Sequence, residues 1–177
     1  MFTQMDIMDT AETLLFSTLC SSLGIGLLPR NNLALTTLPR GRLGAYLAGL
    51  IEGDGDIYVP NNPRSPSGSI NYGSISITFS IKDLPLALTI QTLIGGFIQY
   101  RGNSCHLHVR GRNLFLLISL ISGYMRTPKI EALYRLISWC NATYGSSISK
   151  FPLDTSPLAS NAWLAGLLDA DCSFYFN

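Results

Sequence analysis

Apolar and polar positions along residues 43–144 follow two periods, and each period predicts a different element. Residues 44–54 carry apolar side chains three and four positions apart, the spacing of one face of an amphipathic helix. Residues 72–82 instead alternate between small polar and large apolar side chains, as in a strand with one buried face. Residues 104–110 alternate in the same way, and a hairpin around Gly102-Asn103 pairs them with 97–101.

The remaining elements complete an α+β fold. They are predicted over residues 56–59 (strand) and 83–94, 113–121 and 129–143 (helices). Asp83 is placed to cap the first of these helices, which has Pro85 in its first turn. The order is then αββαββα across 43–144, with an antiparallel sheet whose helices lie on one face. Residues 145–160 have the Ser- and Pro-rich composition of a linker, and Asn161 can cap another helix.

A nine-residue block occurs twice. Residues 47–55 read Leu-Ala-Gly-Leu-Ile-Glu-Gly-Asp-Gly, and residues 164–172 repeat five of these nine residues 117 positions later, with three like-for-like exchanges. Tyr46 and Trp163 precede the two copies. Such a spacing is too wide for a solenoid repeat. It indicates one structural device used once in each of two half-domains.

Small residues recur four positions apart in both copies: Gly49 and Gly53, then Gly166 and Ala170. This spacing allows two helices to pack until their backbones nearly touch. Gly55 is of the residue type that ends a helix in a left-handed conformation. On this evidence alone, a close-packed helix pair without chemistry is the simplest interpretation.

Asp54 and Asp171 add chemistry to that pair. Each stands in the last turn of its predicted helix, where the helix dipole disfavours a carboxylate by about 0.3 to 1 kcal/mol. Two carboxylates brought together at the ends of packed helices repel unless a cation bridges them. A divalent, oxygen-liking ion such as Mg²⁺ would relieve this repulsion. Paired carboxylates holding such ions are a usual arrangement for phosphodiester hydrolysis.

The two blocks, together with the run Ser122 to Leu133, resemble the LAGLIDADG homing endonucleases over residues 43–177. The likeness is to two-motif members encoded within group I introns of fungal mitochondrial genes. It implies an αββαββα half-domain whose sheet forms a saddle over the major groove of double-stranded DNA. It also implies a mitochondrial setting, double-strand cleavage, and a monomer with two pseudo-symmetric halves at full length.

The resemblance further implies which residues form the site. Asp54 and Asp171 would bind Mg²⁺ and carry catalysis, with the main-chain carbonyls of Gly53 and Ala170 as additional ligands. A basic residue near the site is also implied, and Arg126 and Lys129 are the nearest candidates.

The polar side of the predicted sheet is a candidate DNA-binding face. The candidates for reading base edges are Ser74, Ser76, Thr78, Ser80, His106, His108 and Arg110. The candidates for contacting phosphates are Lys82, Arg101 and Arg112. Two alternatives stand beside this interpretation. One side of any antiparallel sheet can simply face water, and His106 with His108 could hold a metal, although the sequence offers no evident third ligand.

Composition changes this picture little. Hydrophobic residues make up 47% of the 177 residues and charged ones 13%, while the net charge of +1 points to no partner. The four cysteines lack metal-site spacing and are best interpreted as reduced thiols. Residues 1–42 are interpreted as an N-terminal extension or fusion remnant. The apolar run 14–28 suggests a membrane protein as a further class, but it is too short to span a bilayer.

Two departures from the family bear on activity. Cys172 replaces the closing glycine of the second block, where a β-carbon would strain a left-handed turn by about 1 kcal/mol. The sequence printed here stops at Asn177, so 161–177 holds only the second helix and the start of a second unit. We therefore expect a truncated endonuclease of reduced or no activity. The alternatives are an RNA-binding maturase that assists group I intron splicing, and a degenerate, non-catalytic relic.

Overall fold

The structure is a computed structural model, and it describes residues 40–171. The expectations about residues 1–39 and about Cys172 lie outside the described residues. Of the two units into which the chain divides, the second, Gly41–Asn177, is the one described below. Within residues 40–171, no helix is long and apolar enough to cross a membrane.

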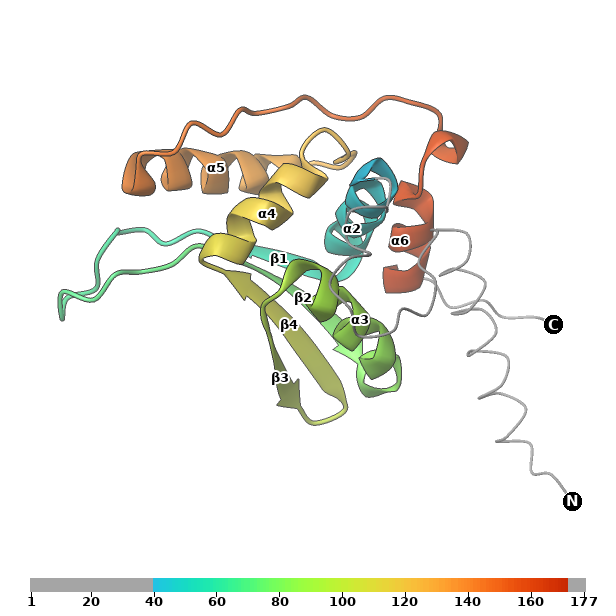
Figure 1. The fold of residues 1–177 in the computed structure, drawn as a ribbon, viewed down its shortest axis with the longest axis horizontal. Coiled ribbons are helices and arrows are strands. Elements are labelled where there is room, and N and C mark those ends of the chain that lie inside the picture. The colour runs from blue at the N-terminus through green and yellow to red at the C-terminus, as the bar shows by residue number, and fades with distance from the viewer. Residues whose placement is uncertain (1–39, 172–177) are drawn as a thin grey trace, which may run out of the picture. The chain divides into compact units, whose positions relative to one another are not determined.

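The order of elements confirms the αββαββα prediction. The bounds are α2 (Arg40–Asp54), β1 (Gly55–Tyr58), β2 (Ser74–Ser80), α3 (Leu84–Ile94), β3 (Phe97–Arg101), β4 (Ser104–Arg110), α4 (Arg112–Ile121), α5 (Ile130–Tyr144) and α6 (Trp163–Asp171). Two short 3-10 turns, Ile81–Asp83 (η2) and Leu158–Ser160 (η3), precede α3 and α6. The fold is therefore mixed α+β, with α5 and α6 as additional helices after the αββαββα unit (Figure 1).

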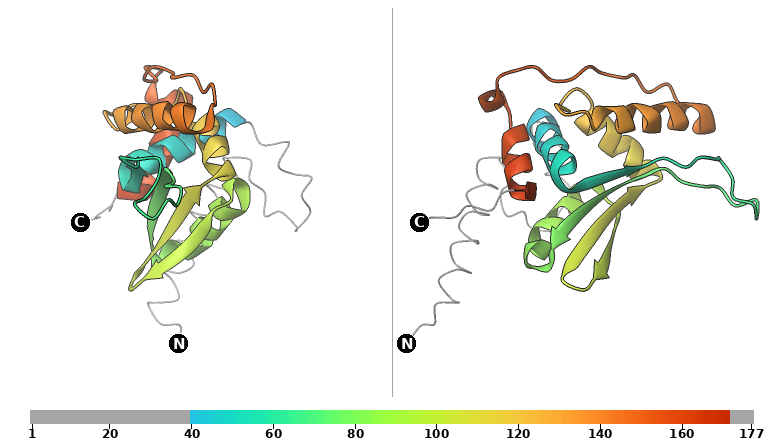
Figure 2. Two further views of the ribbon diagram at one scale, coloured as in Figure 1. Left: turned by 90° about the vertical axis from the view of Figure 1, so that its left-hand side faces the viewer. Right: turned by 180° about the vertical axis from the view of Figure 1, so that it is seen from behind.

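The four strands form one antiparallel sheet in the order β1-β2-β4-β3. One face of its central strands is buried, and it consists of Ile75, Ile77, Phe79, Cys105, Leu107 and Val109. Helices α3 and α4 lie against this face (Figure 2). The other face carries the alternating polar residues, which are half-buried or exposed. The predicted alternation of β2 and β4 is confirmed by this pattern.

Helix α2 is buried on all sides rather than amphipathic. Every residue from Leu43 to Glu52 is buried. On one side a Cβ at Gly44 would lie 2.1 Å from the carbonyl oxygen of Leu120 in α4. On another side Gly49 meets α6. The amphipathic interpretation was wrong because helices pack on more than one face of α2, so that its exposed residues, Arg42 and Asp54, lie near its two ends.

Two local predictions also need correction. Gly55 is not in a left-handed conformation, since it has no positive φ and begins β1. Its Cβ would instead lie 2.5 Å from the carbonyl oxygen of Ile51, so glycine is required there for space. Asp83 precedes α3 but makes no side-chain capping hydrogen bond. The β2 strand ends early, because the Ser80 hydroxyl accepts the Lys82 N–H at 3.4 Å and the chain turns.

Residues 145–157 of the predicted linker 145–160 run without helix or strand from α5 to η3 and are held at several points. The Asp154 N–H donates to the carbonyl of Met125 at 2.8 Å, and the Tyr134 hydroxyl donates to the carbonyl of Phe151 at 2.6 Å. At its end the Asn161 side-chain oxygen accepts the Trp163 N–H at 3.0 Å. These contacts fix where α6 begins.

Candidate active site

Helices α2 and α6 pack through a reciprocal pair of glycines (Figure 1). A Cβ at Gly49 would lie 2.0 Å from the carbonyl oxygen of Trp163, and one at Gly166 would lie 2.0 Å from that of Tyr46. Gly49 and Gly166 are equivalent positions of the repeated block, as are Tyr46 and Trp163. The contact is therefore pseudo-twofold, and glycine is required at both places. Gly53 and Ala170 lie one turn further along and are half-buried.

Two side-chain hydrogen bonds cross the same helix pair with the same symmetry. The Tyr46 hydroxyl donates to Asp169 at 2.8 Å, and the Trp163 indole N–H donates to Glu52. Each bond joins the aromatic residue before one block to the sixth-position acid of the other block. The two acids differ in surroundings, since Glu52 is buried and Asp169 is exposed.

The Glu52 carboxylate also holds the segment before α5. Its oxygens accept the main-chain N–H of Arg126 at 3.0 Å and that of Thr127 at 2.6 Å. The Thr127 hydroxyl donates to the same carboxylate at 2.6 Å. A buried charge is stable only when hydrogen-bonded in this way. Glu52 thus ties α2 to the segment before α5 and to α6.

Lys129 closes the C-terminal end of α2. Its ammonium donates to the carbonyls of Ile51, Glu52 and Gly55 at 2.9 Å and approaches that of Gly53 at 3.4 Å. A cation placed at the last carbonyls of a helix satisfies unpaired acceptors and favours the negative end of the helix dipole. Lys129 therefore lies at the α2 end that carries Asp54.

Arg126 faces the linker instead. Its guanidinium forms an ion pair with Asp154 at 2.6 Å and donates to the carbonyl of Ser156 at 2.6 Å. It also stacks over the Trp163 ring, with 5.4 Å from Cζ to the ring centroid. Of the two basic residues that the sequence suggested, Lys129 places its side-chain cation at the end of α2, whereas Arg126 reaches α2 through its main-chain N–H.

Asp54 and Asp171 are the last residues of α2 and α6. Asp54 is exposed, and the side chain of Asp171 is outside what the structure describes. Both helices run toward the sheet side of the molecule in Figure 1, so their C-terminal ends lie on the same side. Within the described residues no cluster of three or more His, Cys, Asp or Glu side chains is ready to hold a metal. The oxygen donors at these ends, carboxylates and main-chain carbonyls, are of the type that Mg²⁺ prefers.

The candidate DNA-binding residues in β2, β3 and β4 fall on one face of the sheet. Strand register pairs Ser74 with Arg110, Ser76 with His108, Thr78 with His106 and Ser80 with Ser104. Arg101 ends β3 opposite Ser104, Lys82 lies in η2, and Arg112 begins α4. All three of these cations are exposed.

Aromatic stacking organises one part of this face. The ring of Phe97 stacks on that of His108 with centroids 5.1 Å apart, and Arg110 lies 4.9 Å over Phe97. His106 uses both ring nitrogens, with Thr78 at 3.1 Å and Ser104 at 3.2 Å. Burial lowers the pKa of His108, and His106, Arg101 and Arg110 lower it further. The two histidines lie on one strand face, but no third ligand joins them within the described residues.

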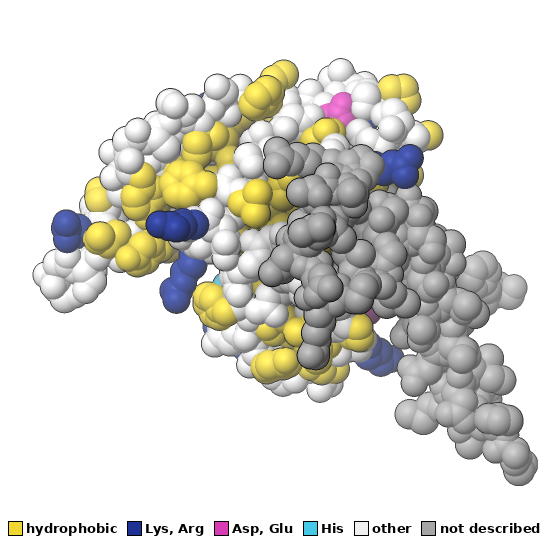
Figure 3. Space-filling view, viewed as in Figure 1, with side chains coloured by type: hydrophobic (Ala, Val, Ile, Leu, Met, Phe, Trp, Pro, Cys, Tyr) yellow, Lys and Arg dark blue, Asp and Glu magenta, His cyan; other side chains and the backbone are white. Residues whose placement is uncertain are grey.

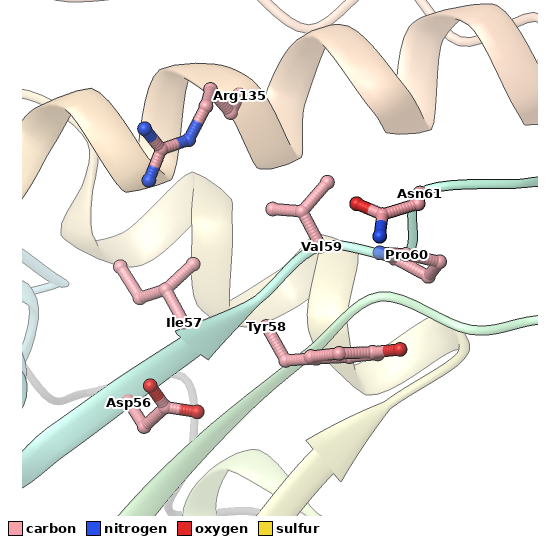
Figure 4. Close-up of a pocket in the computed structure, with 7 residues that line it drawn as sticks. All are labelled: Asp56, Ile57, Tyr58, Val59, Pro60, Asn61 and Arg135. Carbon is pink, nitrogen blue, oxygen red and sulfur yellow. The ribbon is translucent and has the colours of Figure 1, made fainter.

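Sequence reasoning missed several residues of this face and site. The strand register places Asp56 and Tyr58 of β1, and Phe97 and Gln99 of β3, on the same polar face. Figure 4 shows Asp56 and Tyr58 pointing away from α5, while Ile57 and Val59 point toward it. Glu52, Tyr46 and Trp163 were also missed as contacts. The duplicated block held a signal for them, because aromatic residue and acid recur at the same offset of 117.

Two surface features carry less weight. A pocket of about 410 Å³ lies between the edge strand β1 and α5, lined by residues 56–61 and Arg135 (Figure 4). It contains none of the candidate metal ligands. In Figure 3 the Lys and Arg side chains are scattered in small groups on the face shown, so no single basic patch marks a partner there.

The four-stranded antiparallel sheet stands beside two glycine-packed helices that each end in aspartate, the arrangement expected for a protein class built on a repeated helix motif. The family model described as LAGLIDADG endonuclease matches residues 47–141. The chain belongs to the LAGLIDADG endonuclease family.

Two curated yeast proteins are similar to the chain. The intron-encoded DNA endonuclease aI3 of Saccharomyces cerevisiae is 39% identical over 152 residues, covering 77% of this chain and 36% of that protein. The intron-encoded RNA maturase bI4 of the same organism is 29% identical over 142 residues, covering 77% and 20%. The chain thus spans about a third of the first relative and a fifth of the second.

Solved structures of similar chains include two DNA complexes. The LAGLIDADG meganuclease I-CpaMI bound to uncleaved DNA is 16% identical, with a TM-score of 0.49 over 72% of this chain and 58% of that one. The I-SmaMI homing endonuclease bound to cleaved DNA is 18% identical, with a TM-score of 0.49 over 75% and 58%.

Proposed function

We propose that this chain acts in site-specific double-strand cleavage of DNA, as a homing endonuclease. The observation that carries the proposal is the reciprocal packing of Gly49 and Gly166, which holds together two helices that each end in aspartate. A helix pair of this kind would bring two carboxylates to one end of the interface. Family membership and the similarity to an intron-encoded DNA endonuclease support the same activity.

The proposed metal ligands are Asp54 and Asp171, with the main-chain carbonyls of Gly53 and Ala170, and Mg²⁺ is the proposed ion. When bound, such an ion activates a water and stabilises the leaving oxygen. The residues of the chain place these groups. Lys129 holds the end of α2 through its carbonyls, and its positive charge is proposed to face the scissile phosphate.

The uncovered sheet face is the proposed DNA surface. Side chains on β2 and β4 would face base edges, because alternate residues of a strand project to one side. Lys82, Arg101 and Arg112 lie at the margins of that face, and they are proposed to contact phosphates.

Cleavage of DNA that carries the intron-less exon junction tests this proposal. We expect Mg²⁺-dependent nicking by the full chain that is lost in Asp54→Asn and in Asp171→Asn. Glu131→Gln is the matched control, because Glu131 is an exposed acid in the first turn of α5, and it should retain activity. Nicking that persists when both aspartates are replaced would overturn the assignment of the site. A complete absence of nicking in the parent chain would favour the non-catalytic relic.

A second candidate function is assistance of group I intron splicing as an RNA maturase. The similarity to the yeast maturase favours it. Splicing of the host intron in vitro should then be promoted by the chain and remain unchanged in Asp54→Asn. Splicing that depends on Asp54 would contradict a role separate from the metal site.

We also propose a mitochondrial location, as the resemblance to intron-encoded fungal proteins implies. Fractionation of the source cells with an antibody to the chain tests it. Recovery outside the mitochondrial fraction would contradict it.

A further inference from the structure

The Glu52 side chain joins three parts of the site that are far apart in sequence. It projects from α2, accepts hydrogen bonds from Arg126 and Thr127 before α5, and accepts one from Trp163 at the start of α6. Glu52 is only 8% exposed, so water contributes little to the solvation of its carboxylate. The buried carboxylate therefore has all of its hydrogen bonds only when all three segments are in place, and losing any of them costs free energy.

A short path leads from Glu52 to Lys129. The Thr127 hydroxyl donates to Glu52 and also accepts a hydrogen bond from the main-chain N–H of Lys129 at 3.3 Å. The Lys129 ammonium then returns to α2, where it bonds the carbonyl of Glu52 itself at 2.9 Å. Side chain, loop and cation form a closed ring of hydrogen bonds around the end of α2.

We propose that Glu52 is a positioning residue that couples the docking of α6 to the placement of Lys129 at the C-terminal end of α2. This inference rests on the proposed function for its consequence in catalysis. The placement itself is a property of the folded chain. When α6 docks, Trp163 supplies a donor to the carboxylate, and the ordered carboxylate holds Thr127 and so Lys129.

The chemistry of the partners explains why an acid is needed at this position. Within residues 40–171, each recorded partner of the carboxylate is a donor: two main-chain N–H groups, one hydroxyl and one indole N–H. An ionised carboxylate accepts on both oxygens. A glutamine of the same size accepts only on its carbonyl oxygen, so its NH₂ group would face one of the donors and that hydrogen bond would be lost. Glu52→Gln should therefore break the ring without changing volume.

The pseudo-symmetric bond provides a matched control. The Tyr46 hydroxyl also donates across the helix pair, but its acceptor Asp169 makes no recorded bond to the segment that carries Lys129. Tyr46→Phe and Trp163→Phe each remove one donor from the same interface. A second control is Trp139→Phe, because within residues 40–171 the buried Trp139 indole nitrogen has no hydrogen-bond partner, and it lies outside the ring.

Amine labelling of the full chain without metal tests the coupling directly. The chain has three lysines, and Lys82 and Lys150 are exposed while Lys129 is half-buried and bonded. With an amine-reactive reagent and mass spectrometry, we expect Lys129 to be labelled about tenfold or more slowly than Lys82, given its bonds to carbonyls. Trp163→Phe and Glu52→Gln should bring the two rates within about threefold, whereas Tyr46→Phe and Trp139→Phe should not.

Cleavage kinetics then test the consequence. Under single-turnover conditions, Trp163→Phe should lower the cleavage rate about tenfold and leave DNA affinity within about twofold. Equal labelling of Lys129 in Trp163→Phe and Tyr46→Phe would overturn the proposal, even if both variants cleave slowly. If Glu52→Gln does not fold, Trp163→Phe decides the matter. If the parent chain cleaves no DNA, the proposed function fails while the labelling result still judges the coupling.

Discussion

Gly49 and Gly166 occupy equivalent places in the interface between α2 and α6. A Cβ on either would lie 2.0 Å from a carbonyl oxygen of the opposite helix, that of Trp163 or that of Tyr46. The two helices thus approach each other at backbone distance around a pseudo-twofold axis, although they come from segments 117 residues apart. This symmetry is the structural basis for the proposal that the two equivalent acids, Asp54 and Asp171, lie near each other.

Alanine at either glycine should destabilise the fold. Because the clash is with main chain of the other helix, no side-chain rotation can relieve it, and α6 must move away. We expect Gly49→Ala and Gly166→Ala each to lower the free energy of unfolding by about 1 to 3 kcal/mol, as overpacked cores do. Urea denaturation followed by circular dichroism measures this change.

Gly102→Asn serves as the control for the glycine substitutions. Gly102 has positive φ but nothing within 4 Å of its Cβ direction, and asparagine tolerates that conformation. A loss in Gly102→Asn as large as in Gly49→Ala would show that the backbone, not the helix contact, sets the cost.

The elements of this fold could be predicted from sequence because its strands and helices keep clean periods. The alternation in β2 and β4 separated the buried face from the polar face correctly. Helix α3 begins one residue later than predicted and ends where predicted, while α5 begins and ends one residue later than predicted. Local spacing is enough wherever one face of an element is buried and the other is not.

The prediction failed where contacts between distant segments decide the role of a residue. Helix α2 looked amphipathic because its period does not reveal that α4 and α6 cover its other sides. Gly55 looked like a left-handed cap, but the end of α2 is instead bonded by Lys129, 74 residues away. Glu52 was only one acid of the repeat, since nothing local indicates that its partners are Thr127 and Trp163.

The ion pair of Asp154 with Arg126 should make stability depend on pH in the acidic range. Burial raises the pKa of Asp154, but hydrogen bonds from Ser156 and Asn161 and the charge of Arg126 outweigh it, so the pKa is lowered. A lowered carboxyl pKa contributes stability that is present above the unfolded value of about 3.9 and is lost as pH falls through the folded value. Asp154→Asn should therefore cost about 1 to 3 kcal/mol at pH 7.

The test of this ion pair is a comparison across pH. The difference in unfolding free energy between the parent and Asp154→Asn should shrink as pH falls below about 4. A difference that stays constant from pH 7 to pH 3 would mean that packing, not charge, holds the linker. Glu131→Gln, at an exposed acid, should show no such trend.

Cys140 should be inert to thiol reagents in the folded chain. It is buried in α5, and burial raises its pKa to about 11, so almost no thiolate forms at pH 8. We expect iodoacetamide at pH 8 to label Cys140 only as fast as the fold opens, and to label it fully in urea. Site-resolved mass spectrometry measures both rates. Labelling at the rate of a free thiol would contradict the buried position.

The His108 ring should make DNA binding stronger at lower pH. Its pKa is lowered by burial and by the neighbouring His106, Arg101 and Arg110, so the free protein holds it neutral near pH 7. A DNA polyanion at the sheet face favours the protonated ring, so binding takes up a proton. The affinity for DNA should rise about threefold or more from pH 7.5 to pH 5.5. His108→Gln should reduce this rise.

The proposed phosphate contact of Lys82 provides the contrast for His108. Lys82→Met removes an exposed cation beside the same face, so it should weaken binding about equally at every pH and reduce the salt dependence. Fluorescence anisotropy with labelled duplex at fixed ionic strength distinguishes the two. If His108→Gln keeps the full pH dependence, another group on the face must carry it.

Lys129→Met should cost both stability and activity, and the two losses have one cause. The ammonium bonds three carbonyls at 2.9 Å in a half-buried place, so its removal leaves the end of α2 without its donor. Hydrogen bonds to charged groups contribute about 1.5 to 3 kcal/mol, and a loss of that order is expected in urea denaturation. Lys150→Met is the control, because Lys150 is exposed and its cation faces the Tyr134 ring at 5.5 Å.

Lys129→Arg separates geometry from charge: a guanidinium keeps the positive charge but cannot reproduce the compact ammonium among converging carbonyls. If Lys129→Arg restores stability and cleavage together, charge alone suffices; if it restores neither, the position of the ammonium is what α2 requires.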